Sequence, residues 1–171
     1  HSSNTTTGVS GSVAIGKSAL NALTSGAKNL AIGYSAASSL TTGNSNIVLG
    51  YEAFDGADGG ETGNIAIGQE AMSSADEGAS GTIDNNIAIG GNALYGGAMS
   101  STNATSGNIA IGKNALQATS TNPQTGTIAI GHQALTALTS GAGNVAVGYT
   151  AGDEISTGAQ NTLIGYGAMH N

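Results

Sequence analysis

The chain of 171 residues contains no cysteine, no tryptophan and a single proline. Without cysteine, neither a disulfide framework nor a thiolate metal site nor a thiol nucleophile is available. Aromatic residues make up only 4% of the chain, so they cannot build a large globular core. Ile, Val, Leu and Ala can fill a narrow interior, which predicts a thin cross-section.

Charge is also scarce in this sequence. Charged residues account for 8% of the chain, only three of them are basic, and the formal net charge is −7. Binding a phosphate backbone needs clustered Lys and Arg, so nucleic acid is excluded as a partner. No run of about 18 apolar residues occurs, so we expect no membrane span. The chain starts at His1 without a signal segment, and we expect a processed chain or a fragment.

One short phrase is present nine times: an apolar residue, usually Ala, another apolar residue, Gly, two variable residues and Ala. Successive phrase glycines are 17, 17, 18, 22, 22, 19, 17 and 17 residues apart. They are Gly16, Gly33, Gly50, Gly68, Gly90, Gly112, Gly131, Gly148 and Gly165. A nearly fixed period is typical of a solenoid, whose units bury their apolar faces by stacking. We expect one repeat domain over residues 1–171, without an internal boundary.

The phrase predicts a short strand followed by a second segment. Ile47 and Leu49 alternate around Val48, as in a strand with one buried face, and Gly50 ends it. Seventeen residues suffice for two strands and two tight turns, whereas strand-plus-helix repeats usually run to about 20–29 residues. We therefore predict an all-β parallel β-solenoid of about nine coils, roughly 40 Å long at a strand spacing of about 4.8 Å.

Stacked coils turn equivalent residues into columns. We expect a ladder of large apolar residues inside the coil: Ile15, Ile32, Leu49, Ile67, Ile89, Ile111, Ile130, Val147 and Ile164. Asparagine precedes the strand in seven of the nine copies, as Asn29, Asn46, Asn64, Asn86, Asn108, Asn144 and Asn161, with Ser12 and Thr127 in the others. We predict a structural amide ladder there, because stacked amides can bond along the axis.

The residue between the two large apolar residues would then point outward. This stripe comprises Ala14, Ala31, Val48, Ala66, Ala88, Ala110, Ala129 and Ala146, and ends at Leu163. An apolar stripe on the exterior usually means that a partner covers it. We predict side-by-side association of identical chains through it. The alternative is that the second layer of the same coil covers the stripe.

The longer intervals insert loops at residues 73–85, 95–107 and 117–126, which in solenoids often carry recognition. Eight of the ten acidic residues lie between Glu52 and Asp84, and Asp55, Asp58 and Glu61 could supply oxygen ligands to calcium. Their spacing matches no established loop and does not recur. We therefore expect no cofactor and a solvated acidic loop, with calcium as the weaker alternative.

Catalytic motifs are missing. The three histidines, His1, His132 and His170, lie in no nucleophile or zinc motif, and the glycines form no nucleotide loop. His132 occupies a variable position after a repeat glycine, which predicts an outward side chain. We expect a protein that is not an enzyme.

Phrases such as Ser12-Val13-Ala14-Ile15-Gly16 and Asn64-Ile65-Ala66-Ile67-Gly68 resemble the head repeats of trimeric autotransporter adhesins and similar repeats of phage tail-fibre shafts. The resemblance covers essentially the whole chain. It implies a left-handed β-roll, a homotrimer and attachment outside the cell. The period is longer than in the usual adhesin head repeat, and no neck, heptad stalk or membrane anchor is present.

These observations predict a non-catalytic extracellular structural or adhesive protein, a β-solenoid fibre or adhesin shaft with a host surface or matrix ligand. One alternative is a subunit of a head-to-tail filament, because the two termini are in phase with the repeat. Another is an ice-binding or glycan-binding surface, with turn hydroxyls such as Thr24, Thr41, Thr42 and Thr139 as candidates.

Overall fold

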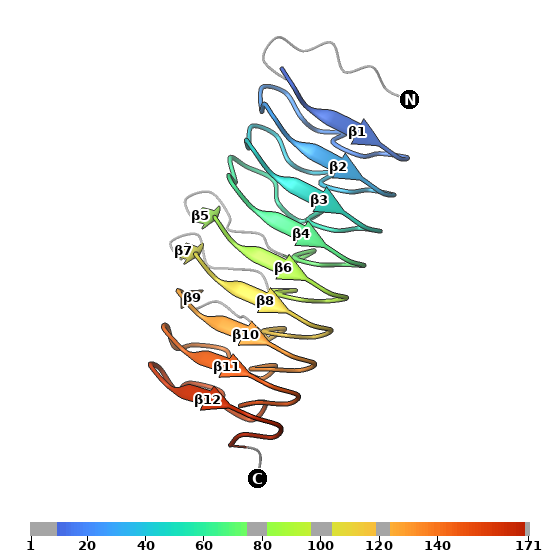
Figure 1. Cartoon of the computed structure of the whole chain (residues 1–171). Helices are drawn as coiled ribbons and strands as arrows, with labels where there is room; N and C mark the ends of the chain where they lie inside the picture. The colour runs from blue at the N-terminus through green and yellow to red at the C-terminus, as the bar shows by residue number, and fades with distance from the viewer. Residues whose placement is uncertain (1–9, 75–81, 97–103, 119–123, 170–171) are drawn as a thin grey trace.

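The computed structural model describes residues 10–74, 82–96, 104–118 and 124–169. Their regular secondary structure consists of short β-strands joined by turns, and the described ranges contain no helix. Figure 1 shows the strands stacked along one axis from the N-terminal to the C-terminal end. The predicted all-β parallel β-solenoid is confirmed.

The main sheet has nine parallel strands in the order β1-β2-β3-β4-β6-β8-β10-β11-β12, one from each phrase. They are β1 Val13–Ile15, β2 Leu30–Ile32, β3 Ile47–Leu49, β4 Ile65–Ile67, β6 Ile87–Ile89, β8 Ile109–Ile111, β10 Ile128–Ile130, β11 Val145–Val147 and β12 Thr162–Ile164. Nine strands are separated by eight returns of the chain, one fewer than nine. The number of complete turns is therefore slightly below the nine coils predicted.

Equivalent residues pair directly, so the columns predicted from the repeat exist. Ala66 pairs with Ala88, and Ala88 pairs with Ala110, across consecutive strands of the main sheet. Intervals of 18, 22 and 19 residues keep the same register as those of 17, because the extra residues lie outside the strands. The phrase therefore fixes the register.

The glycine after each strand makes the corner of the coil. Gly90 has φ +135°, a backbone conformation that side chains disfavour, and a Cβ placed there would lie 2.6 Å from the carbonyl carbon of Gly112. Most phrase glycines make the same close approach to the glycine of the following coil. Glycine is required here both by conformation and by contact.

The segment after each corner differs from the second strand that we predicted. It is a run of turns in which the second and fourth residues after the glycine are left-handed, as at Asn92 (φ 55°) and Leu94 (φ 46°). These bends direct Ala93 and Leu94 into the coil, where both are buried. Hydrogen bonds still run from coil to coil, as from Leu94 N to Ala115 O at 2.9 Å.

A second, three-stranded parallel sheet occurs in the coils with insertions and was not predicted. Its strands are β5 Thr82–Asp84, β7 Ala104–Ser106 and β9 Gln124–Thr125, each shortly before a strand of the main sheet. Ile83, Thr105 and Gln124 point inward from it and are buried. The predicted loops are therefore partly strand, and residues 75–81, 97–103 and 119–123 lie outside the described residues.

The predicted asparagine ladder is confirmed. Asn64 donates from Nδ2 to Asn46 Oδ1 (3.2 Å) and to Ile83 O (2.7 Å), and its own Oδ1 accepts from Asn86 N (3.0 Å) and Asn86 Nδ2 (3.2 Å). The same pattern recurs at the neighbouring asparagines. It breaks at Thr127, whose Oγ1 is buried without a hydrogen-bond partner.

Candidate association surface

The predicted association stripe is wrong in orientation. Ala31, Ala66, Ala88, Ala110, Ala129 and Ala146 are fully buried, and Val48 is 1% exposed. They belong to the single core cluster of the described coils, together with the alanine and the larger residue that follow each corner. Only Ala14, in the first described strand, is exposed. The second layer of the same coil covers the stripe, which was the alternative considered.

The alternation of side chains along the strand explains this orientation. Asn46 must point inward to join the amide ladder, and Val48, two residues later, points to the same side. The flanking Ile47 and Leu49 then point outward. The narrow coil is already filled by the larger residue that follows each corner alanine, such as Leu94. The facing strand therefore has room only for alanine or valine inside, whereas its large residues fit outside.

The large apolar residues therefore form what we call the outer apolar face. It comprises Val13, Ile15, Leu30, Ile32, Ile47, Leu49, Ile65, Ile67, Ile87, Ile89, Ile109, Ile111, Ile128, Ile130, Val145, Val147 and Ile164. Residues in the middle strands are half-buried by one another, and exposure rises to 57% at Ile15 and 72% at Ile164. The expected inner ladder from Ile15 to Ile164 thus lies on the outside of the coil, as one of two apolar columns that are half-buried in the middle strands.

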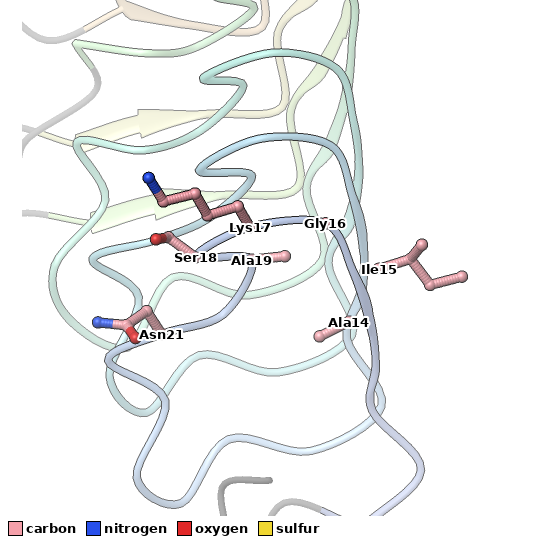
Figure 2. Close-up of a pocket in the computed structure, with 7 residues that line it drawn as sticks. All are labelled: Ala14, Ile15, Gly16, Lys17, Ser18, Ala19 and Asn21. Carbon is pink, nitrogen blue, oxygen red and sulfur yellow. The ribbon is translucent and has the colours of Figure 1, made fainter. Parts of the chain in front are cut away.

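A further column of side chains is formed by the residue directly after each phrase glycine, where the backbone turns. This corner column consists of Lys17, Tyr34, Tyr51, Gln69, Gly91, Lys113, His132, Tyr149 and Tyr166. Figure 2 shows that Ile15 and Lys17 leave the backbone on different sides of the corner at Gly16. The corner column therefore borders the outer apolar face, and it was not singled out from the sequence.

Rings in the corner column stack along the axis. The ring centroids of Tyr34 and Tyr51 are 5.3 Å apart, those of His132 and Tyr149 5.0 Å, and those of Tyr149 and Tyr166 5.1 Å. Lys17 Nζ lies 5.6 Å from the Tyr34 ring centroid, a cation–π contact. His132 is half-buried within this stack, with a buried Nδ1 that lacks a hydrogen-bond partner.

A neighbouring acidic side chain changes the pKa of one of these tyrosines. A hydrogen bond to Glu52, together with the negative charge of that carboxylate, raises the pKa of the Tyr51 phenol above its ordinary value.

The structure separates the calcium candidates. Asp58 is exposed, Asp55 is half-buried and hydrogen-bonded to Ser73, and Glu61 is 2% exposed. Glu61 Oε1 accepts from Gly59 N at 3.0 Å, while Oε2 is buried without a partner. No group of three metal-ligating side chains occurs within the described ranges. Asp55, Asp58 and Glu61 are thus not assembled into one cluster.

Three of the four turn hydroxyls predicted for ice or glycan recognition have structural partners, whereas Thr42 is exposed. Thr24 Oγ1 donates to Thr41 O (3.0 Å), Thr41 Oγ1 to Asp58 O (2.8 Å) and Thr139 Oγ1 to Ser156 O (2.9 Å). Each bond ties one coil to the next.

A hollow opens at each end of the described coils. The hollow at the first coil has a volume of about 790 Å³ and is lined by Ala14, Ile15, Gly16, Lys17, Ser18, Ala19 and Asn21 (Figure 2). In the coils between the first and the last, the equivalents of Ala14 and Ala19 are buried, as at Ala66 and Ala71. The lining is thus the ordinary stacking surface of the repeat.

No helix in the described ranges is long and apolar enough to cross a membrane.

Comparisons with protein families, curated proteins and solved structures find no match to this chain.

Proposed function

We propose that this protein is a non-catalytic extracellular structural or adhesive β-solenoid whose identical chains associate through the outer apolar face. The observation that carries the proposal is the long array of Ile, Val and Leu on the outer side of the main sheet, half-buried in the middle strands and exposed toward the ends. Contiguous exposed apolar surface on a soluble protein usually marks an interaction site.

The period of this array favours a second copy of the chain as partner. Apolar side chains recur on every strand, about 4.8 Å apart, over nine strands. Only a partner with the same period keeps every strand in contact along the whole length, and an identical chain has that period. A face nine strands long and three residues wide measures roughly 400 Å².

Stable interfaces bury about 800 Å² per partner, twice the area of this face. Each chain must then meet more than one neighbour, which suits the homotrimer that the resemblance to adhesin heads implies. A rod of stacked coils with so little charge serves as a spacer or as an attachment surface, which supports a fibre or adhesin shaft with a matrix or host-surface ligand.

Self-association is tested by the mass in solution of the full chain and of an Ile89→Lys/Ile109→Lys variant. Both residues lie on the outer apolar face, so the variant should keep the circular dichroism of the parent while falling to the monomer mass in sedimentation velocity. Thr125→Lys, an exposed site in a neighbouring coil, is the matched control and should leave the mass unchanged. A parent chain that is monomeric at every concentration refutes the proposal.

Electron microscopy and ligand binding test the remaining parts. Short discrete rods support the shaft, whereas long unbranched fibres favour the head-to-tail filament. Retention on immobilised matrix glycoproteins is expected for an adhesin. Thermal hysteresis in its place would favour the ice-binding alternative.

A further inference from the structure

Four of the five tyrosines lie in the corner column, in two axial pairs. The centroids are 5.3 Å apart in the Tyr34–Tyr51 pair, with an interplanar angle of 11°. In the Tyr149–Tyr166 pair they are 5.1 Å apart, with an angle of 7°. The fifth tyrosine, Tyr95, lies outside this column and has no such ring contact within the described coils.

The backbone holds the members of each pair together. Glu52 N donates to Tyr34 O at 2.9 Å, and Gly167 N donates to Tyr149 O at 2.8 Å, so the paired residues stay one coil apart. The rings themselves remain accessible, with 42% exposure at Tyr34, 49% at Tyr51 and 47% at Tyr149. Each pair thus places two phenols in fixed proximity at the protein surface.

We propose that Tyr34–Tyr51 and Tyr149–Tyr166 are sites of intrachain dityrosine formation, each linking two neighbouring coils covalently. The oxidant is hydrogen peroxide acting through a haem peroxidase. This proposal concerns the chemistry of the folded chain and does not rest on the function proposed above.

The reaction balances as a two-electron oxidation. Each phenol loses one electron and one proton to become a phenoxyl radical, while hydrogen peroxide accepts the two electrons and two protons and becomes two water molecules. The radicals join through a carbon–carbon bond between ring positions ortho to oxygen. The hydrogens on these carbons then move to the oxygens and restore two phenols, so the chain loses two hydrogen atoms per link.

The geometry favours coupling within a pair over other reactions of the radicals. Two reacting groups held in one arrangement react as if highly concentrated, since they need not meet by diffusion. A link between residues 17 apart would restrict the unfolded chain as a disulfide does, in a sequence that lacks cysteine.

The test is oxidation of the dilute full chain with a haem peroxidase and hydrogen peroxide, followed by cleavage after Lys, Asp and Glu. Peptide 29–52 contains both Tyr34 and Tyr51. It should lose two hydrogens and gain dityrosine fluorescence. Tyr149 and Tyr166 fall in different peptides because Asp153 and Glu154 separate them. These peptides should become linked in material that runs as a single chain on a denaturing gel.

Matched variants separate paired coupling from general oxidation. Tyr51→Phe should abolish the modified peptide 29–52 and keep the Tyr149–Tyr166 link, and Tyr149→Phe should do the reverse. Tyr95→Phe should leave both links. Oxidation of the urea-unfolded chain should give a severalfold lower yield of both. Absence of either link, or equal yield from folded and unfolded chain, overturns the proposal.

Discussion

Removal of one rung from the asparagine ladder should destabilise the chain far more in the middle than at the end. Asn64→Ala removes the Nδ2 group that donates to Asn46 Oδ1 and Ile83 O, and the Oδ1 atom that accepts from Asn86 N and Asn86 Nδ2. Asn64 and Asn86 are fully buried, so water cannot replace these partners.

The cost follows from these contacts. A buried backbone N–H without its acceptor costs about 1–3 kcal/mol, and each further lost hydrogen bond costs about 1 kcal/mol. With two such bonds lost at Asn64 Nδ2 and one at Asn86 Nδ2, the sum is about 4–6 kcal/mol. This is a large share of the roughly 5–15 kcal/mol that stabilises a typical domain.

Asn161→Ala is the matched control, since Asn161 is only half-buried and its side chain makes one ladder bond, from Nδ2 to Asn144 Oδ1 at 2.9 Å. We expect it to cost about 1 kcal/mol. Urea unfolding at one fixed protein concentration measures both, because the proposed association would make stability depend on concentration. Hydrogen exchange at the Asn86 amide should accelerate in Asn64→Ala alone. Equal costs for the two variants would refute the ladder as a source of stability.

Three further predictions concern the ladder break, the corner and the acidic turn. Thr127→Asn should raise the urea midpoint by the equivalent of about 1 kcal/mol, because it replaces an unpartnered buried hydroxyl with the missing amide; an unchanged or lower midpoint contradicts this. Gly90→Ala should cost about 3 kcal/mol or more in urea unfolding because its Cβ would lie 2.6 Å from Gly112, whereas Gly107→Ala, at φ +66° with nothing within 4 Å, should cost about 1–2 kcal/mol; similar losses would argue against the contact. Burial raises the pKa of the Asp55 carboxyl above its ordinary 3.8, so its contribution to stability is full below that value and is lost as pH rises through the raised pKa. Relative to the parent chain, Asp55→Asn should therefore raise the thermal midpoint more at neutral pH than at acid pH. Asp58→Asn should change the midpoint equally at both pH values.

Strand position and register follow from sequence because each phrase repeats the same local pattern. Val48 and Ala66 hold the same place in the phrase, and they pair in the sheet. The asparagine ladder was predictable for the same reason. Asparagine recurs at the same position in seven of the nine copies, and stacked side-chain amides can bond to one another along the axis. The left-handed winding implied by the resemblance stays a prediction.

The direction of each face was harder to predict, because a three-residue strand with apolar residues at every position shows no polar side. Size suggested that Ile47 was inside and Val48 outside, whereas the structure has the opposite. The parity of Asn46 with Val48 was the signal that could have settled it. The short second sheet escaped prediction because Ile83, Thr105 and Gln124 share a position but not a residue type.

Because each corner glycine from Gly16 to Gly148 lies against the glycine of the next coil in the same way, duplication or loss of a single repeat changes the length of the molecule by one fixed increment and leaves all other contacts as they were. Insertions and deletions that are whole multiples of the phrase are therefore structurally neutral, while those of a few residues are tolerated only in the segments that precede the strands. Length can thus evolve independently of cross-section.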